Sequence, residues 1–243
     1  MQKRIARKLD LEMLLSRVKP HPTPSPDLEQ YTISADVAAT MLYIAAYVND
    51  DIVGKTVLDL GCGTGRLTLG AAFLGARQAV GVDIDKTAVK AAYDNSEETG
   101  LKQKVQWVAA DINAVCGSFD TVLQNPPFGV QKRGADRKFV ERALEVGKIV
   151  YSLHKNVQDK TAFSKSKTRK TNVEKVSPSP FLGKIIEEHG GEIKGVYAMK
   201  MTIPYMFSFH TKRRHEFTVD LYVIEKKRRA RDNQDSRLIG NRL

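Results

Sequence analysis

Two consecutive prolines, Pro126 and Pro127, place the tightest constraint on how this chain can fold. They follow a short apolar run, residues 119–123, that is typical of a buried strand. Proline has no N–H to give to a β-ladder, and it also pushes the residue before it toward an extended conformation. The sequence therefore predicts a stiff loop that leaves the carboxyl end of a strand and presents Asn125 and Phe128 there.

Alternating strand and helix patterns around this loop predict an α/β fold with a mostly parallel sheet. The predicted strands cover residues 56–60, 79–82, 105–109, 119–123, 149–153, 196–203 and 216–224. The predicted helices cover residues 67–74, 86–98, 136–147 and 181–189, the third of them capped by Asp136. Ligands of open sheets bind at the carboxyl edge, which is where the double-proline loop emerges.

The amino-terminal part of the chain predicts a helical cover, residues 1–50, over that edge. Apolar residues at helical spacing indicate one helix over residues 4–18. A proline-rich linker follows, and a second helix is expected from Ser34, as its N-cap, to about Asn49.

The rest of the chain is expected to form a main domain, residues 51–225, with two strongly basic additions. Residues 155–178 are rich in lysine and predict a flexible insertion, and residues 226–243 predict a disordered tail. The whole chain carries a formal net charge of +11. Such a charge favours a polyanionic partner, most often nucleic acid, although a basic protein without such a partner has the same composition.

The cysteine content argues against a disulfide framework and against a zinc site. Only Cys62 and Cys116 occur in the chain, too few for either. The sequence also contains neither a signal-peptide pattern nor an apolar run of about 18 residues. We therefore expect no metal and no membrane association, and a reducing, cytoplasmic location.

A glycine-rich turn between a predicted strand and a helix indicates a ligand site. Gly61, Gly63 and Gly65 would let the backbone approach a ligand closely. A dinucleotide-binding turn has a further glycine three residues after its second one. Arg66 occupies that position, so the motif departs from nicotinamide or flavin binding.

Three aspartates at consecutive strand ends complete the prediction of this site. Asp59 ends the first strand, and Asp83 ends the second at the spacing where a carboxylate meets ribose hydroxyls. Asp111 follows the third strand and could accept from an adenine amino group. A single aspartate at such a place is as often a helix cap. The three aspartates and the glycine turn together predict a nucleoside site that carries no phosphate.

These motifs resemble those of class I methyltransferases, and more narrowly the methyltransferase-like protein 5 family. The resemblance is carried by residues 28–31, 41–43, 59–65, 81–85, 125–129, 150–155 and 219–221. It implies a Rossmann-like sheet of seven strands with an antiparallel last strand and helices on both faces, S-adenosylmethionine as cofactor, and N6-methylation of adenosine in small-subunit ribosomal RNA. It also implies, as a partner, a small zinc-binding adaptor protein at an exposed sheet edge. The implied cofactor contacts are Gln30, Asp59, Gly61, Gly63, Thr64, Gly65, Asp83, Ile84, Asp111 and Ile112.

The chemistry of the double-proline loop can be argued without the resemblance. An adenine amino group is a poor nucleophile because its lone pair is delocalised into the ring. The side-chain oxygen of Asn125 and the carbonyl of Pro126 could accept its two N–H bonds and so free that lone pair. Pro127 would stiffen the loop, and Phe128 would stack on the base unless it only packs in the core.

Basic and aromatic residues near this loop are candidates for RNA contact. They are Lys132 and Arg133, directly after the loop, and Phe207, Phe209, His210, Lys212, Arg213 and Arg214 between the last two strands. Other acceptors for the same loop are a guanine N2 amine, a DNA adenine or a protein glutamine, although glutamine enzymes of this kind usually carry tyrosine in place of Phe128. A non-catalytic RNA-binding subunit of the same fold is a further alternative.

Overall fold

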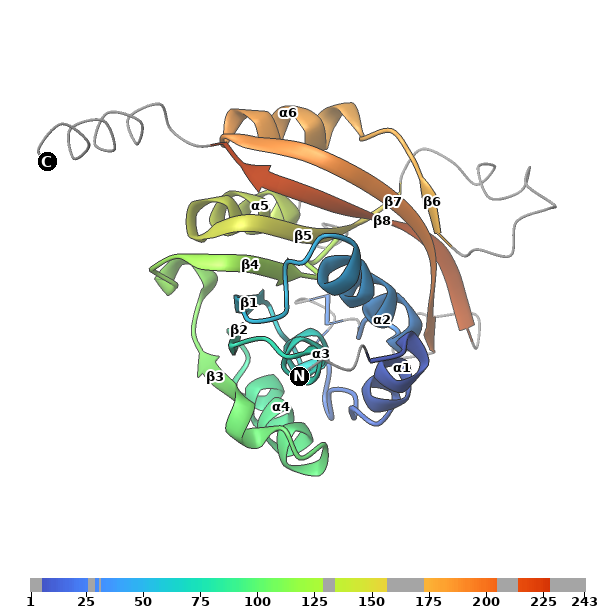
Figure 1. The fold of residues 1–243 in the computed structure, drawn as a ribbon, viewed down its shortest axis with the longest axis vertical. Coiled ribbons are helices and arrows are strands. Elements are labelled where there is room, and N and C mark those ends of the chain that lie inside the picture. Colours follow the sequence, from blue (N-terminus) through green and yellow to red (C-terminus); the bar gives the residue numbers. More distant parts are fainter. Residues whose placement is uncertain are drawn as a thin grey trace, which may run out of the picture.

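An eight-stranded sheet forms the centre of the molecule (Figure 1). The computed structural model describes residues 6–25, 29–30, 32–128, 134–156, 173–204 and 214–227. The strands are β1 Thr56–Leu60, β2 Gln78–Asp83, β3 Val105–Ala109, β4 Phe119–Gln124, β5 Gly147–Lys155, β6 Val173–Lys175, β7 Gly191–Pro204 and β8 Arg214–Lys226. Their order across the sheet is β3-β2-β1-β4-β5-β8-β7-β6.

Strands β1 to β5 are parallel, as predicted, and β8 runs antiparallel to both β5 and β7. The predicted α/β class and the antiparallel last strand are confirmed. The strand count rises from seven to eight because β6 pairs with the outer side of β7. Strand β6 lies inside the segment 155–178 that was predicted to be flexible, of which residues 157–172 lie outside the described part of the chain.

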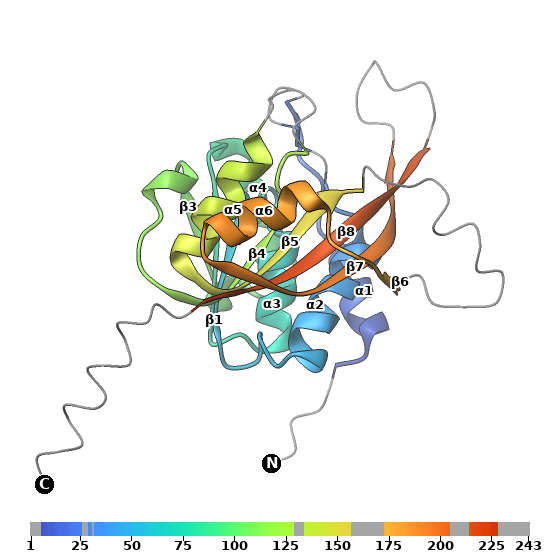
Figure 2. The same cartoon turned by 90° about the horizontal axis from the view of Figure 1, so that it is seen from above.

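Helices cover both faces of the sheet (Figures 1 and 2). They are α1 Lys8–Ser16, α2 Ala35–Tyr43, α3 Arg66–Leu74, α4 Lys86–Glu98, α5 Ala135–Val146 and α6 Pro180–Glu188. A π-helical turn, Ile44–Val48, extends α2, and 3-10 turns span Lys102–Lys104 and Ile112–Ala114. Helices α1 to α3 share one buried apolar cluster with the sheet, and α5 and α6 share another on the opposite face. None of these helices is both long and apolar enough to cross a membrane.

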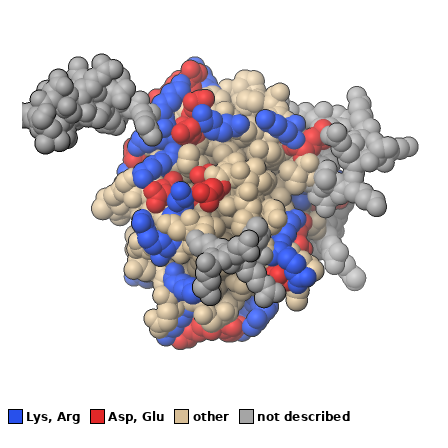
Figure 3. Space-filling view, viewed as in Figure 1, with Lys and Arg blue, Asp and Glu red and all other residues tan. Residues whose placement is uncertain are grey.

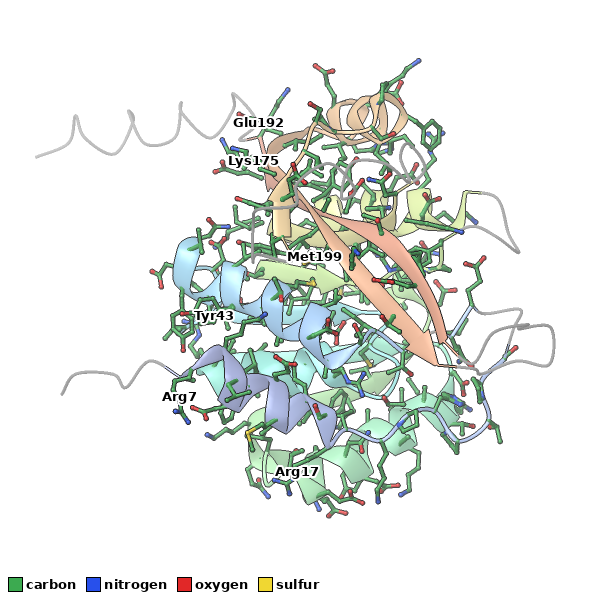
Figure 4. All side chains as sticks on the ribbon, turned by 90° about the vertical axis from the view of Figure 1, so that its right-hand side faces the viewer. Arg7, Arg17, Tyr43, Lys175, Glu192 and Met199 are labelled. Carbon is green, nitrogen blue, oxygen red and sulfur yellow. The ribbon has the colours of Figure 1, made fainter. Side chains whose placement is uncertain are left out.

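The amino-terminal cover packs into the main core rather than lying on its surface. Leu11 and Leu15 of α1 and Leu42 of α2 are fully buried in the same cluster as α3. Figure 4 shows α1 and α2 side by side along this face. Ser34 occupies the predicted N-cap position of α2, but its hydroxyl makes no capping hydrogen bond.

The start of α5 differs from the prediction. Asp136 was expected to cap this helix, but the N-cap is Gly134, whose φ of 77° is left-handed. Asp136 instead lies in the first turn, where its carboxylate accepts from the N–H of Arg137. A carboxylate there still suits the positive end of the helix dipole.

Candidate functional site

A cavity of about 340 Å³ opens at the carboxyl edge of the parallel strands. The predicted residues that line it are Gln30, Asp59, Gly61, Gly63, Thr64, Asp83, Ile84, Asp111, Ile112, Asn125 and Pro127. Lining residues that the sequence did not place at this site include His21, Arg66 and Phe139. The cavity thus brings the predicted cofactor residues other than Gly65 into one site with Asn125 and Pro127 of the double-proline loop.

Gly65 shapes the site from behind rather than lining it. Its φ is 87°, and a Cβ atom there would lie 2.4 Å from the Trp107 ring. The turn therefore needs glycine at this position both for its left-handed backbone and for the close approach of β3.

Asp83 is held rigidly at the end of β2. One carboxylate oxygen accepts from the N–H of Gly63 at 2.8 Å, and the other accepts from the N–H of Asp85 at 2.9 Å. Burial raises the pKa of Asp83. Each carboxylate oxygen can accept more than one hydrogen bond, so Asp83 can fix the glycine turn and still accept from ligand hydroxyls.

Asp59 lines the same cavity, but its hydrogen bonds go to the protein. One of its oxygens accepts from both the N–H and the hydroxyl of Thr68, at 3.0 and 2.7 Å. Asp59 is almost fully buried, and this burial raises its pKa to about 7. These contacts connect the first turn of α3 to the end of β1. The geometry therefore favours a role for Asp59 in supporting the glycine turn.

Asp111 caps a helical turn and also lines the cavity. Its Oδ1 accepts from the N–H of Asn113 at 2.8 Å and caps the 3-10 turn that follows β3. Its neighbour Ile112 and the 57% exposed Ile84 add apolar surface to the cavity. Carboxylates beside exposed apolar surface suit a nucleoside, whose hydroxyls need acceptors and whose flat base needs cover.

Hydrogen bonds that the sequence did not reveal join the amino-terminal cover to residues around the cavity. Gln30 was expected to reach the cofactor, and in the structure its amide donates to Asp85 at 2.7 Å while it lines the cavity. His21 also bonds Asp85, through Nε2 at 3.0 Å, and its Nδ1 accepts from the N–H of Thr23. Asn95 of α4 donates to the carbonyls of Lys19, in the cover, and of Thr64, in the turn.

Arg66 makes a second set of hydrogen bonds with the amino-terminal cover. Its guanidinium donates to the carbonyls of Val18 and Ile33, at either end of the segment that lines the cavity. Burial lowers its pKa to about 10, so Arg66 stays charged near neutral pH. The only sequence signal was negative, because Arg66 stands where a dinucleotide-binding turn has glycine.

The residues of the double-proline loop differ in whether they line the cavity or pack in the core. Asn125 and Pro127 line the cavity, whereas Pro126 is buried and Phe128 is partly buried against the core. The Phe128 ring meets Phe217 of β8 edge-on, with centroids 5.9 Å apart. Phe128 therefore has a packing contact, and Phe217 is an aromatic neighbour of the loop that the sequence analysis missed.

Most of the predicted RNA contacts lie outside the described residues. These are Lys132, Arg133, Phe207, Phe209, His210, Lys212 and Arg213. Arg214 begins β8 and pairs with Pro204 of β7. Residues Arg214–Thr218 pair only with β7, so the β7–β8 ribbon extends past β5 at the edge that holds the cavity (Figure 2).

Comparison with known proteins gives matches along nearly the whole chain. The family model of the methyltransferase small domain matches residues 34–154. The rRNA N(6)-adenosine-methyltransferase METTL5 of Danio rerio is 34% identical over 217 residues, which cover 87% of this chain and 95% of that protein. An uncharacterized protein of Methanocaldococcus jannaschii is 38% identical and covers 90% of this chain and 94% of its own length. A solved structure of a candidate RNA methyltransferase from Pyrococcus horikoshii is 34% identical, with a TM-score of 0.76 over 93% of this chain and 100% of that one.

Proposed function

Because this chain belongs to the methyltransferase-like protein 5 family, we propose that it methylates the exocyclic N6 of an adenosine in RNA, with S-adenosylmethionine as methyl donor. We further propose small-subunit ribosomal RNA as the substrate. The observation that carries the proposal is the position of Asn125, which follows β4 and lines the same cavity as Asp83 and Asp111. An amide for the target base and carboxylates for a nucleoside cofactor thus share one cavity.

The main contribution of the protein to the reaction is to orient the target amino group. The side-chain oxygen of Asn125 and the carbonyl of Pro126 accept from the two N–H bonds of the adenine amino group and favour a pyramidal nitrogen. S-adenosylmethionine supplies a methyl group on a positively charged sulfur that is already activated for transfer. The amino proton becomes acidic only after transfer, so no strong base is required. Preorganised acceptors and correct placement are then the main contributions of the protein.

The distribution of charge supports RNA as the acceptor. On the face shown in Figure 3, basic and acidic side chains are interspersed. The positive excess instead comes from sequence outside the described ranges, notably residues 129–133, 157–172 and 205–213, which hold nine lysines and arginines and one aspartate. These three segments follow the loop after β4 and the carboxyl ends of β5 and β7. Because β4, β5 and β7 run in the same direction, the basic segments leave the sheet at the edge that holds the cavity.

A methylation assay tests this proposal directly. Unmodified small ribosomal subunits and naked ribosomal RNA are incubated with the protein and labelled S-adenosylmethionine, then digested and separated as nucleosides. We expect the label in N6-methyladenosine. Label in N2-methylguanosine or in a protein glutamine would replace the proposed acceptor, as would methylation of DNA adenine in a parallel reaction. Cofactor binding without any transfer would instead support the non-catalytic alternative.

We also propose that a small zinc-binding adaptor pairs with β3. This strand forms one edge of the sheet, and Val108 on it is 43% exposed. Exposed edge strands with apolar side chains are ready to pair with another chain. The adaptor of the same organism should form a stable complex with the protein and raise its Tm, and Val108→Asp should weaken the complex. Equal binding of the wild-type chain and the variant would exclude this edge.

A cytoplasmic location is a further proposal. Cys62 and Cys116 are both free, and Cys116 is exposed. Exposed free thiols suit a reducing compartment, where disulfides rarely persist.

A further inference from the structure

The direction of the double-proline loop is set by the residue that precedes it, Gln124. Gln124 is the last residue of β4, and it pairs with Leu60 of β1 on one side and Ser152 of β5 on the other. The two prolines beyond it cannot donate to a ladder. The orientation of Asn125 therefore depends on how firmly Gln124 is held.

A buried line of side chains holds Gln124 to β5. Its amide nitrogen donates to the Ser152 hydroxyl at 2.8 Å, and that hydroxyl lies 2.7 Å from Nε2 of His154. Gln124 and Ser152 are fully buried, and His154 is 3% exposed. The His154 ring in turn meets Tyr222 of β8 edge-on, with centroids 5.4 Å apart. The line thus crosses from β4 to β5 and ends against β8.

The protonation state of His154 fits this line. Burial lowers the pKa of His154 to about 4, so its ring is neutral near pH 7. Since Gln124 donates into the Ser152 oxygen, the Ser152 hydroxyl proton is free to point at Nε2 of His154. The Gln124 amide neither gains nor loses a proton in this pH range. The line can therefore fix geometry, but it cannot carry a proton away from the reaction.

Burying three polar side chains here is costly, the more so because Oε1 of Gln124 has no hydrogen-bond partner among the described residues. The same face of the sheet holds the apolar cluster that includes Val122, Val150 and Ile224, and apolar residues could fill this space without any desolvation cost. Polar networks inside a core instead specify one arrangement of the groups they join. None of the three side chains lines the cavity, so their effect on the reaction must pass through the loop.

We propose that Gln124, Ser152 and His154 are positioning residues that fix the orientation of the Asn125 loop for methyl transfer. The inference rests on the proposed role of Asn125, and it applies to whichever amino or amide nitrogen the loop serves. It assigns a purpose to His154, which the reaction itself does not use.

Two substitutions of the same shape at Ser152 isolate the hydroxyl. Ser152→Thr keeps the oxygen and adds a methyl group, whereas Ser152→Val adds the same bulk and removes the oxygen. Loss of this hydrogen bond leaves a buried amide without its acceptor, which corresponds to roughly a tenfold to hundredfold change. We expect Ser152→Val to lower kcat by about that factor relative to Ser152→Thr, with the Kd for S-adenosylmethionine equal in the two variants. Equal kcat values, or a cofactor affinity that falls along with kcat, would overturn the proposal.

A second variant tests whether the residues act as one line. Gln124→Met has similar length and lacks the amide, so it should lower kcat about as much as Ser152→Val does. The double variant should lose little more, because residues of one network are not additive. If the factors by which the two single variants lower kcat multiply in the double variant, the residues do not act as a single line of contacts.

Hydrogen exchange at Asn125 and Phe128 gives a readout that needs no activity. Both residues have backbone N–H groups beside the prolines, and we expect faster exchange at both in Ser152→Val than in Ser152→Thr. If the wild-type chain transfers no methyl group, the proposed function fails, and the exchange comparison still decides the positioning role. Equal exchange in the two variants would reject that role.

Discussion

Asn125→Ala should lower the rate of methyl transfer by about a hundredfold to a thousandfold, the usual cost of removing one preorganised polar group from a reaction centre. The variant loses the side-chain oxygen proposed to accept from the target amino group. Asp83 and Asp111, the proposed cofactor residues, lie elsewhere in the sheet, at the end of β2 and after β3. The Kd for S-adenosylmethionine should therefore change by less than about threefold, a difference below 1 kcal/mol. Single-turnover rates and calorimetric titration measure the two quantities separately.

Asn125→Asp is the matched control for this experiment. The aspartate has the same size and keeps an oxygen in place, so it can still accept from an N–H, although its charge disturbs the site. We expect its rate to fall between those of the wild type and Asn125→Ala. A rate for Asn125→Ala close to that of the wild type would reject the proposed mechanism. Loss of cofactor binding in Asn125→Ala would show that Asn125 serves the cofactor instead.

The central part of the fold could be predicted because its signals are local. The predicted strands at residues 56–60 and 105–109 agree with β1 and β3, and the predicted helix at residues 86–98 agrees with α4. Each of these elements has its own periodicity and its own glycine or aspartate at the end. Strand β6 has three residues, and it exists through pairing with Met199, Ala198 and Tyr197 of β7. No local pattern encodes such a pairing.

The candidate site, too, could be predicted from the sequence only in part. Glycines and aspartates at strand ends predicted which residues would meet, because the topology of a parallel sheet places those ends on one edge. The sequence could not tell which way each carboxylate faces. Asp59 bonds Thr68, nine residues away, whereas Gln30 and His21 meet at Asp85 across more than fifty residues. Contacts of that range depend on packing of the complete chain, and a single sequence does not display them.

Asp83→Ala should weaken binding of S-adenosylmethionine by about tenfold to two-hundredfold, since a hydrogen bond to a charged group contributes roughly 1.5–3 kcal/mol. The substitution removes the acceptor for ligand hydroxyls. It also removes the acceptor for the N–H groups of Gly63 and Asp85. The glycine turn keeps the hydrogen bonds of Gly61 and Cys62 to the Val82 carbonyl of β2. It loses the one from Gly63, so the loss of affinity should lie toward the upper end of this range. At saturating cofactor the rate of transfer should fall much less than in Asn125→Ala, because the acceptor loop is unchanged.

Asp94→Ala is the control for charge, since it also removes one carboxylate. Asp94 lies in α4, paired with Lys90 on an exposed surface, and surface pairs of this kind contribute little. Its Kd for the cofactor should equal that of the wild-type chain. If Asp83→Ala binds S-adenosylmethionine as tightly as Asp94→Ala does, the carboxylate at the end of β2 does not hold the cofactor. The assignment would then have to move to Asp111, the carboxylate at the same cavity whose second oxygen is not used by its cap.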